Sequence, residues 1–219
     1  MKKYRSVFIS DTHLGTKNCK DKKLLEFLKS FSAENLFLVG DIIDGWSLKQ
    51  KHYWTTEQTE ILRRILKLSE KMQVVYVVGN HDDFIRPFFK FDFQFGTLKI
   101  VDDYQYLDLS GRKIYITHGD RFDFTMKIPK WIISAPDFLL DRLGKPSAND
   151  KIVKWVVDRI GTRKRAECFA ENYKYDSCII GHTHLPEISP QYMNCGDWVS
   201  NNSYLVETLN GKWELKYWS

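Results

Sequence analysis

Apolar and polar residues follow two alternating patterns in the first third of the chain. Short apolar runs predict three buried strands, at residues 4–10, 36–39 and 73–78. Between these runs, apolar residues recur every three or four positions, which predicts helices over about residues 20–31 and 55–72. Strands that alternate with helices favour a sheet with parallel pairs, in which ligands bind at the carboxyl ends of the strands.

The pattern changes in the middle of the chain. Further strands are predicted at residues 98–101, 104–109, 113–117, 177–180, 187–193, 204–208 and 212–217. The sequences SGRK (110–113) and NG (210–211) are typical of hairpin turns. A mostly helical pattern interrupts these strands. We therefore expect one α/β domain over residues 1–219, with a helical cap inserted at about residues 121–175.

Five of the predicted strands end in short polar clusters that hold nearly all of the histidines. The clusters read SDTH, GDIID, GNHD, HGD and GHTH, and only His52 among the six histidines lies outside them. Their candidate metal ligands are Asp11, His13, Asp41, Asn80, His118, His182 and His184. A single cluster of this kind is typical of an ordinary turn with a surface histidine. Five clusters at converging strand ends are different, because carboxylates brought so close would repel each other strongly.

Metal cations would remove this repulsion. The candidate ligands are Asp oxygens, an Asn carbonyl and imidazoles without a thiolate, which suits Mn, Fe or Zn better than Ca or a Cys-rich zinc site. Seven such groups exceed what one ion needs and match two ions that share one carboxylate. The sequence therefore predicts a binuclear metal centre at the carboxyl ends of the strands.

The composition limits which cellular compartment and which classes of partner are expected for this chain. No apolar run approaches the roughly 20 residues of a membrane helix, and the segment before Asp11 is too short for the apolar core of a signal peptide. The four scattered cysteines, without a CxxC pair, are expected to be reduced thiols of a cytoplasmic protein. The net charge of +5 is compatible with an anionic substrate or an anionic membrane surface, but it is too small to favour nucleic acid.

The five motifs, in this order, resemble those of the calcineurin-like binuclear metallophosphoesterases over about residues 6–198. The resemblance implies a four-layer α-β-β-α sandwich that binds two divalent ions. By this resemblance, one ion is held by Asp11, His13, Asp41 and His184. The other is held by Asp41, Asn80, His118 and His182, with Asp41 bridging the two. Because no ligand of the motif set is missing, a non-catalytic scaffold of the same fold is disfavoured.

The same resemblance implies roles in catalysis. A water bridging both ions would be the nucleophile, because metal coordination can lower the pKa of water to about 7. Asn80 would help to neutralise the phosphoryl oxygens, and His81 would donate a proton to the leaving oxygen. Asp44 would fix the tautomer of His81 and hold its proton. Asp82 and Asp83 are expected to have only supporting roles.

Further features are similar to one group within the family, the UDP-2,3-diacylglucosamine hydrolases, which are pyrophosphatases of lipid A synthesis. They are GDIIDGW with Trp46, GHTHLP (181–186), NCGDWV (194–199) and the insertion between HGD and GHTH. The likeness implies manganese, a cytoplasmic enzyme at the inner-membrane surface, and acyl chains bound under the cap. One motif differs from those of the group. The hydrolases have a motif similar to GNRD at the place where this chain has GNHD (79–82), and this difference leaves the physiological substrate open.

Two substrate classes therefore remain. The favoured class is UDP-2,3-diacylglucosamine or a similar lipid-linked nucleotide diphosphate, and the alternative is a soluble phosphodiesterase or nucleotidase acting on nucleotides or nucleic acid. Apolar residues of the insertion would form an acyl chamber, lie on an anionic bilayer or only pack the cap on the sheet. They are Phe122, Phe124, Ile128, Trp131, Ile132, Ile133, Phe138 and Leu139, interleaved with Lys127, Lys130 and Arg142. The basic run TRKRAE (162–167) would reach a phosphate or a uridine, or form a solvated helix face.

Overall fold

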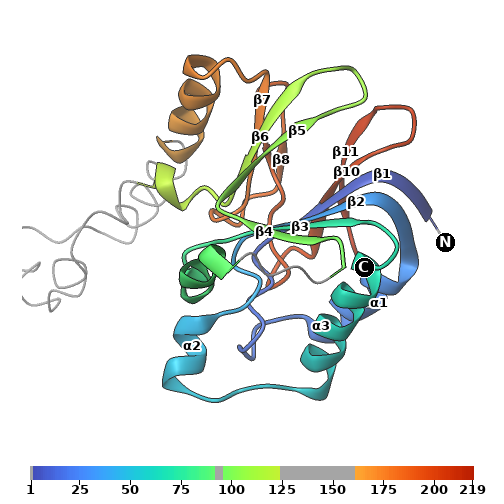
Figure 1. The fold of residues 1–219 in the computed structure, drawn as a ribbon, viewed down its shortest axis with the longest axis vertical. Helices are drawn as coiled ribbons and strands as arrows, with labels where there is room; N and C mark the ends of the chain where they lie inside the picture. Colours follow the sequence, from blue (N-terminus) through green and yellow to red (C-terminus); the bar gives the residue numbers. More distant parts are fainter. Residues whose placement is uncertain (1, 92–95, 124–160) are drawn as a thin grey trace, which may run out of the picture.

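The computed structural model describes residues 2–91, 96–123 and 161–219 (Figure 1). Within these ranges the strands form two sheets that pack face to face, and helices cover both outer faces. The α/β sandwich expected from the sequence is therefore confirmed. Residues 124–160, which carry most of the expected cap, lie outside the described residues.

The first sheet has six strands in the order β11-β10-β1-β2-β3-β4. Its members are β1 (Lys2–Ile9), β2 (Phe31–Val39), β3 (Gln73–Val77), β4 (Leu98–Val101), β10 (Ser203–Glu207) and β11 (Trp213–Tyr217). The strands from β1 to β4 run parallel, so that their carboxyl ends meet at one edge of the sheet. The β10–β11 hairpin extends the sheet antiparallel to β1.

The second sheet has five strands in the order β5-β6-β7-β9-β8. Its members are β5 (Asp103–Leu107), β6 (Lys113–Thr117), β7 (Ser177–Ile180), β8 (Glu187–Ile188) and β9 (Tyr192–Asn194). The three central strands β6, β7 and β9 are parallel, and antiparallel strands flank them on both edges. The second sheet therefore also presents a set of carboxyl ends at one edge.

Alternation along β1 divides its side chains between two cores. Val7 and Ile9 pack in the core that includes the helices α1 and α3, whereas Phe8 lies in the core between the two sheets, because successive strand residues face opposite sides. The ring of Phe8 stacks on Phe37 of β2 with the centroids 4.6 Å apart. Both faces of this sheet are covered, which explains why its central strands read as continuous apolar runs in the sequence.

Helices form the two outer layers (Figure 1). Those on the first sheet are α1 (Asp21–Ser30) and α3 (Thr56–Ser69). Thr55 caps α3, because its side chain accepts a hydrogen bond from the Gln58 amide at 3.1 Å. On the second sheet, residues 161–172 are helical and bury Ala166 and Ala170.

The local structure differs from the elements expected from the sequence in two ways. The single strand expected at residues 187–193 is wrong: β8 and β9 form a hairpin there, because Pro190 lacks an N–H group and the chain turns. Three short helices were also not predicted. Two of them, α2 (Gly45–Gln50) and the 3-10 helix η2 (Asp120–Phe122), are too short to repeat a 3.6-residue pattern. The third, η1 (Asp83–Phe91), is a 3-10 helix with three residues per turn. Among the described residues, no helix is long and apolar enough to cross a membrane.

We predict that Phe37→Ala strongly destabilises the fold. Phe37 is 1% exposed between the sheets, and truncation of a buried Phe costs about 3–5 kcal/mol. Chemical denaturation at constant metal content measures the free energy of unfolding. Leu66→Ala on α3, where the side chain is 43% exposed, is the matched control and should change that free energy by less than about 0.5 kcal/mol. Equal losses in the two variants would contradict the importance of the core between the sheets.

Candidate metal centre

The polar clusters meet where the carboxyl ends of the two sheets lie together. They follow β1 (Asp11, His13), β2 (Asp41), β3 (Asn80, His81), β6 (His118) and β7 (His182, His184). Backbone hydrogen bonds tie the first two loops together, from the Asp11 amide to Gly40 O and from the His13 amide to Asp41 O, both 3.0 Å. The strand order thus brings residues far apart in the sequence to one place.

Most of the predicted ligands leave their strands from an unusual backbone conformation. Among the described residues other than glycine, seven have a positive φ, and five of these are predicted ligands. They are Asp11, His13, Asp41, His182 and His184. This left-handed conformation costs energy for a residue with a Cβ and persists only where the surroundings enforce it. Its concentration here indicates a site built for function.

Two glycines make room for the carboxylate and imidazole groups. Gly40 has a φ of +78°, and a Cβ there would lie 2.2 Å from His118 Nδ1. A Cβ on Gly79 would lie 2.2 Å from Asp41 Oδ1. Atoms cannot approach so closely, so both positions require glycine. These motif glycines therefore serve the packing of the site as well as the turn of the chain.

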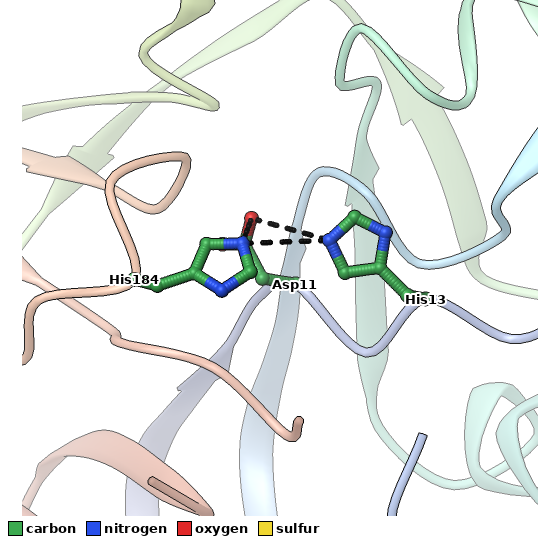
Figure 2. A group of neighbouring side chains, drawn as sticks. All are labelled: Asp11, His13 and His184. Carbon is green, nitrogen blue, oxygen red and sulfur yellow. Dashed lines mark hydrogen bonds and ion pairs between the residues drawn. The ribbon is translucent and has the colours of Figure 1, made fainter. Parts of the chain in front are cut away.

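Asp11, His13 and His184 converge on one point from two loops (Figure 2). His184 Nε2 lies 3.1 Å from Asp11 Oδ1 and 3.4 Å from His13 Nε2. The distance from His13 Nε2 to Asp11 Oδ1 is 3.9 Å. Two imidazole nitrogens so close cannot both carry a proton, so at least one presents a lone pair. These three side chains are able to hold a cation.

A second group surrounds Asp41. Its Oδ2 is 3.2 Å from His118 Nε2, and its Oδ1 accepts a hydrogen bond from the His81 amide at 2.8 Å. His118 donates its other ring N–H to Val39 O at 3.1 Å, which directs Nε2 toward the cluster. Ligand atoms of Asp11, Asp41 and His118 lie within 4.8 Å of one another, so the two groups are contiguous.

Nδ1 of His81, which contacts Asp44 only as an ion pair, has no hydrogen-bond partner in the described part of the chain, and neither have three buried polar atoms of the predicted ligands. They are Asp11 Oδ1, Asn80 Oδ1 and His118 Nε2. Each belongs to a predicted ligand, and a buried polar atom left without a partner costs about 1–3 kcal/mol. Divalent cations would satisfy all three atoms. The residues present therefore fit a metal centre.

Opposite charges already stabilise the cluster. Burial by itself raises the pKa of both Asp11 and Asp41, but nearby histidines outweigh burial and lower both values. The main partner is His184 for Asp11 and His118 for Asp41. Burial lowers the pKa of His118, but Asp41 and Asp11 raise it to about 10. Bound cations would displace such protons, because a ligating imidazole is neutral.

His81 lies at the ligand cluster, where its ligand atom and those of His13 and Asp41 are within 4.8 Å of one another. Its Nδ1 is 3.0 Å from Asp44 Oδ2 and its Nε2 is 3.9 Å from Asp41 Oδ2. The ring packs against Trp46 with the centroids 4.1 Å apart. Burial lowers the pKa of His81, but Asp44 and Asp41 raise it by more, which favours the protonated ring. The two residues predicted to act on the leaving group, His81 and Asp44, therefore lie in contact.

His182 is the predicted ligand that stands apart. Its Nε2 is 2.9 Å from Asp123 Oδ2, where the insertion begins. In the described part of the chain it belongs to none of the groups whose ligand atoms lie together, although its amide donates to Asp11 Oδ2 at 2.9 Å. The contact with Asp123 was not predicted, because a lone carboxylate after HGD has no spacing that marks it.

Two other buried carboxylates brace the site. Asp82 is fully buried and accepts hydrogen bonds from the amides of Ile43 at 2.7 Å and Gly79 at 3.2 Å, so it ties the loop after β2 to the loop after β3. Asp197 Oδ2 lies 3.8 Å from His184 Nδ1. The contact of Asp197 was not predicted, although NCGDWV contains that residue.

Comparison with known proteins identifies the family. Residues 4–186 match the calcineurin-like phosphoesterases, and the chain belongs to that family. It is 24% identical to a UDP-2,3-diacylglucosamine hydrolase of Histophilus somni strain 129Pt, over 94% of this chain and 97% of that protein. It is 26% identical to a hydrolase of the same name from Vibrio atlanticus, over 93% of each chain. Another, from Neisseria gonorrhoeae, is 36% identical over 52% of this chain and 48% of its own.

A solved structure supports the fold. Yfce, a phosphoesterase from E. coli, is similar with a TM-score of 0.50 at 17% identity, over 98% of this chain and 99% of that one. Membership of the family implies divalent metal ions, and the described aspartate and histidine groups are able to hold them.

We predict that Gly79→Ala damages the metal centre. The new Cβ would lie 2.2 Å from Asp41 Oδ1 and 2.5 Å from the Asp41 amide nitrogen, so Asp41 must move. Overpacking of this kind costs about 1–3 kcal/mol of stability. We expect less bound Mn²⁺ by elemental analysis and a lower unfolding temperature.

Gly161→Ala is the matched control, because its Cβ would approach only the flexible end of the Arg165 side chain, at 3.1 Å. It should leave the metal content unchanged. A Gly79→Ala chain that binds Mn²⁺ as well as the wild type would contradict the close packing around Asp41.

Proposed function

We propose that this chain holds two divalent ions, with manganese favoured over iron or zinc, and hydrolyses a phosphoanhydride or phosphoester. In this proposal one ion is held by Asp11, His13, Asp41 and His184, and the other by Asp41, Asn80, His118 and His182. When bound, the ions supply an acidified water and positive charge at the phosphoryl oxygens. The observation that carries the proposal is the set of buried ligand atoms without hydrogen-bond partners at the strand ends.

The chain's own residues act on the phosphoryl and leaving oxygens. His81 donates a proton from Nε2 to the leaving oxygen, while Asp44, 3.0 Å from Nδ1, keeps the ring in the required tautomer. Trp46 packs on the ring and limits its rotation. Asn80, adjacent in the chain, orients a phosphoryl oxygen. Proton donation and phosphoryl binding thus come from one loop, the loop after β3.

We further propose that the substrate is UDP-2,3-diacylglucosamine or a similar lipid-linked nucleotide diphosphate. Support comes from the relatives of that name, which align over 93–94% of this chain. We also propose that the enzyme is cytoplasmic, acts in lipid A synthesis and contacts the anionic inner membrane peripherally. The acyl chamber that the proposal needs falls on residues 124–160, outside the described residues.

The alternative substrate is a nucleotide, cut by a phosphodiesterase or nucleotidase activity. One difference in sequence favours this alternative. His81 stands at the position of the arginine in the GNRD-like motif of the UDP-2,3-diacylglucosamine hydrolases. A histidine can give a proton to a poor leaving group, whereas an arginine remains charged and offers only hydrogen bonds. We prefer the lipid substrate because the relatives named for it align over 93–94% of this chain.

The arginines of TRKRAE have partners within the protein. Arg163 pairs with Glu167 at 2.9 Å and with Glu187, and Arg165 donates to Phe122 O. These contacts support a role in holding the helix of residues 161–172 to its surroundings. We therefore do not assign either arginine to substrate binding.

A comparison of substrates tests the proposed function. With added Mn²⁺, we expect kcat/KM for UDP-2,3-diacylglucosamine to exceed that for UDP-sugars, cyclic nucleotides and single-stranded DNA by at least about tenfold, which corresponds to ~1.4 kcal/mol. Bis-p-nitrophenyl phosphate is the general control for phosphodiester hydrolysis. An untouched lipid nucleotide beside a well-cut nucleotide would establish the alternative, and inactivity on every compound would indicate a scaffold.

We predict that His81→Ala separates turnover from metal binding. Loss of a general acid lowers kcat by about 10²–10⁴-fold, while Mn²⁺ content should stay the same because His81 is not a proposed ligand. Steady-state kinetics and elemental analysis measure the two quantities. His52→Ala, at the exposed histidine outside the clusters, is the matched control and should change neither. Loss of metal together with activity would show that His81 is a ligand.

A further inference from the structure

One carboxylate oxygen lies between two histidines that have different proposed roles. Asp44 Oδ2 is 3.1 Å from Nδ1 of His13 and 3.0 Å from Nδ1 of His81. The other oxygen, Oδ1, accepts a hydrogen bond from the Ser47 amide at 2.7 Å, where α2 begins. The side chain of Asp44 is only 6% exposed, so water competes little for these contacts.

The contact with His13 selects its tautomer. A carboxylate only accepts hydrogen bonds, so the ring nitrogen that faces Asp44 carries the hydrogen and Nε2 keeps the lone pair. His13 Nε2 points toward Asp11 and His184, at 3.9 Å and 3.4 Å (Figure 2). Metal-ligating histidines are commonly oriented by a carboxylate on the opposite ring nitrogen.

We propose that Asp44 is a positioning residue for His13, and through it for the ion that His13 holds, in addition to its role beside His81. The inference rests on the proposed metal centre. The two rings that share Asp44 lie edge to face, at 90° with their centroids 4.8 Å apart. A single carboxylate therefore aligns a metal ligand and the proton donor relative to each other.

Asp44→Asn tests this inference because a side-chain amide has only one oxygen. It cannot accept hydrogen bonds from both histidines and from the Ser47 amide. If the amide oxygen keeps the Ser47 contact, the NH₂ group faces His13 and forces its hydrogen onto Nε2, where an ion needs a lone pair. An Asp→Asn change beside a functional histidine is known to impose the wrong tautomer. We expect Mn²⁺ affinity at one of the two sites to fall by about 10–100-fold. Calorimetric titration of the metal-free full chain with Mn²⁺ measures this change.

Three variants separate this role from others. His81→Ala removes the second histidine on Asp44 and should keep wild-type Mn²⁺ affinity. Asp83→Asn makes the same change of charge at an exposed acid nearby and should also keep it. Asp44→Ala leaves the His13 tautomer free, so it should lose less Mn²⁺ affinity than Asp44→Asn. Its lost α2 cap should nevertheless lower the unfolding temperature.

The outcomes are distinguishable. Wild-type Mn²⁺ affinity in Asp44→Asn would overturn the inference and leave the metal centre standing. A greater loss in Asp44→Ala than in Asp44→Asn would overturn it as well, because Asp44 would then act only through the fold of α2. A wild-type chain that binds no Mn²⁺ would remove the proposed function and, with it, this inference.

Discussion

Repulsion between buried carboxylates is the constraint on which this structure depends. Ligand atoms of Asp11, Asp41 and His118 lie within 4.8 Å of one another, and all three residues are buried. Two like charges 4–5 Å apart cost on the order of a few kcal/mol where water is mostly excluded. His118 and His184 offset this cost, because burial is outweighed by the nearby aspartates, which raise the pKa of each ring. Each ring would offer a lone pair to a bound ion.

The fold meets this constraint with a rigid frame. Parallel strands end at one edge of each sheet, and the two edges lie together, so the predicted ligands follow within one to four residues of the strand ends. The left-handed backbone at Asp11 and Asp41 is unfavourable alone and is held by hydrogen bonds between the loops. Apolar cores on both faces of the first sheet hold its strands in fixed positions. Such a site is organised before its ions arrive.

The sequence predicted most of the strands and brought forward a candidate ligand set, because both have a periodic or clustered signal. Apolar runs marked β1 to β3, and the ordered motifs marked Asp11, Asp41 and His118. What it missed depends on contacts between distant segments. The pairing of His182 with Asp123 and the second histidine on Asp44 follow from loop geometry, which no spacing encodes. Likewise, α2 forms because Asp44 caps it, and six residues are too few for a helical period.

The residues proposed for the chemistry belong to one linked set in the described part of the chain. The residues proposed to hold the ions and to move the proton all lie outside residues 124–160. His81 is held by Asp44 and packed by Trp46, and both belong to the loop and helix that follow β2. Proton donation is therefore tied to the ligand loops, because Asp44 also contacts His13. A change at Asp44 is therefore expected to disturb the proposed metal binding and proton transfer together.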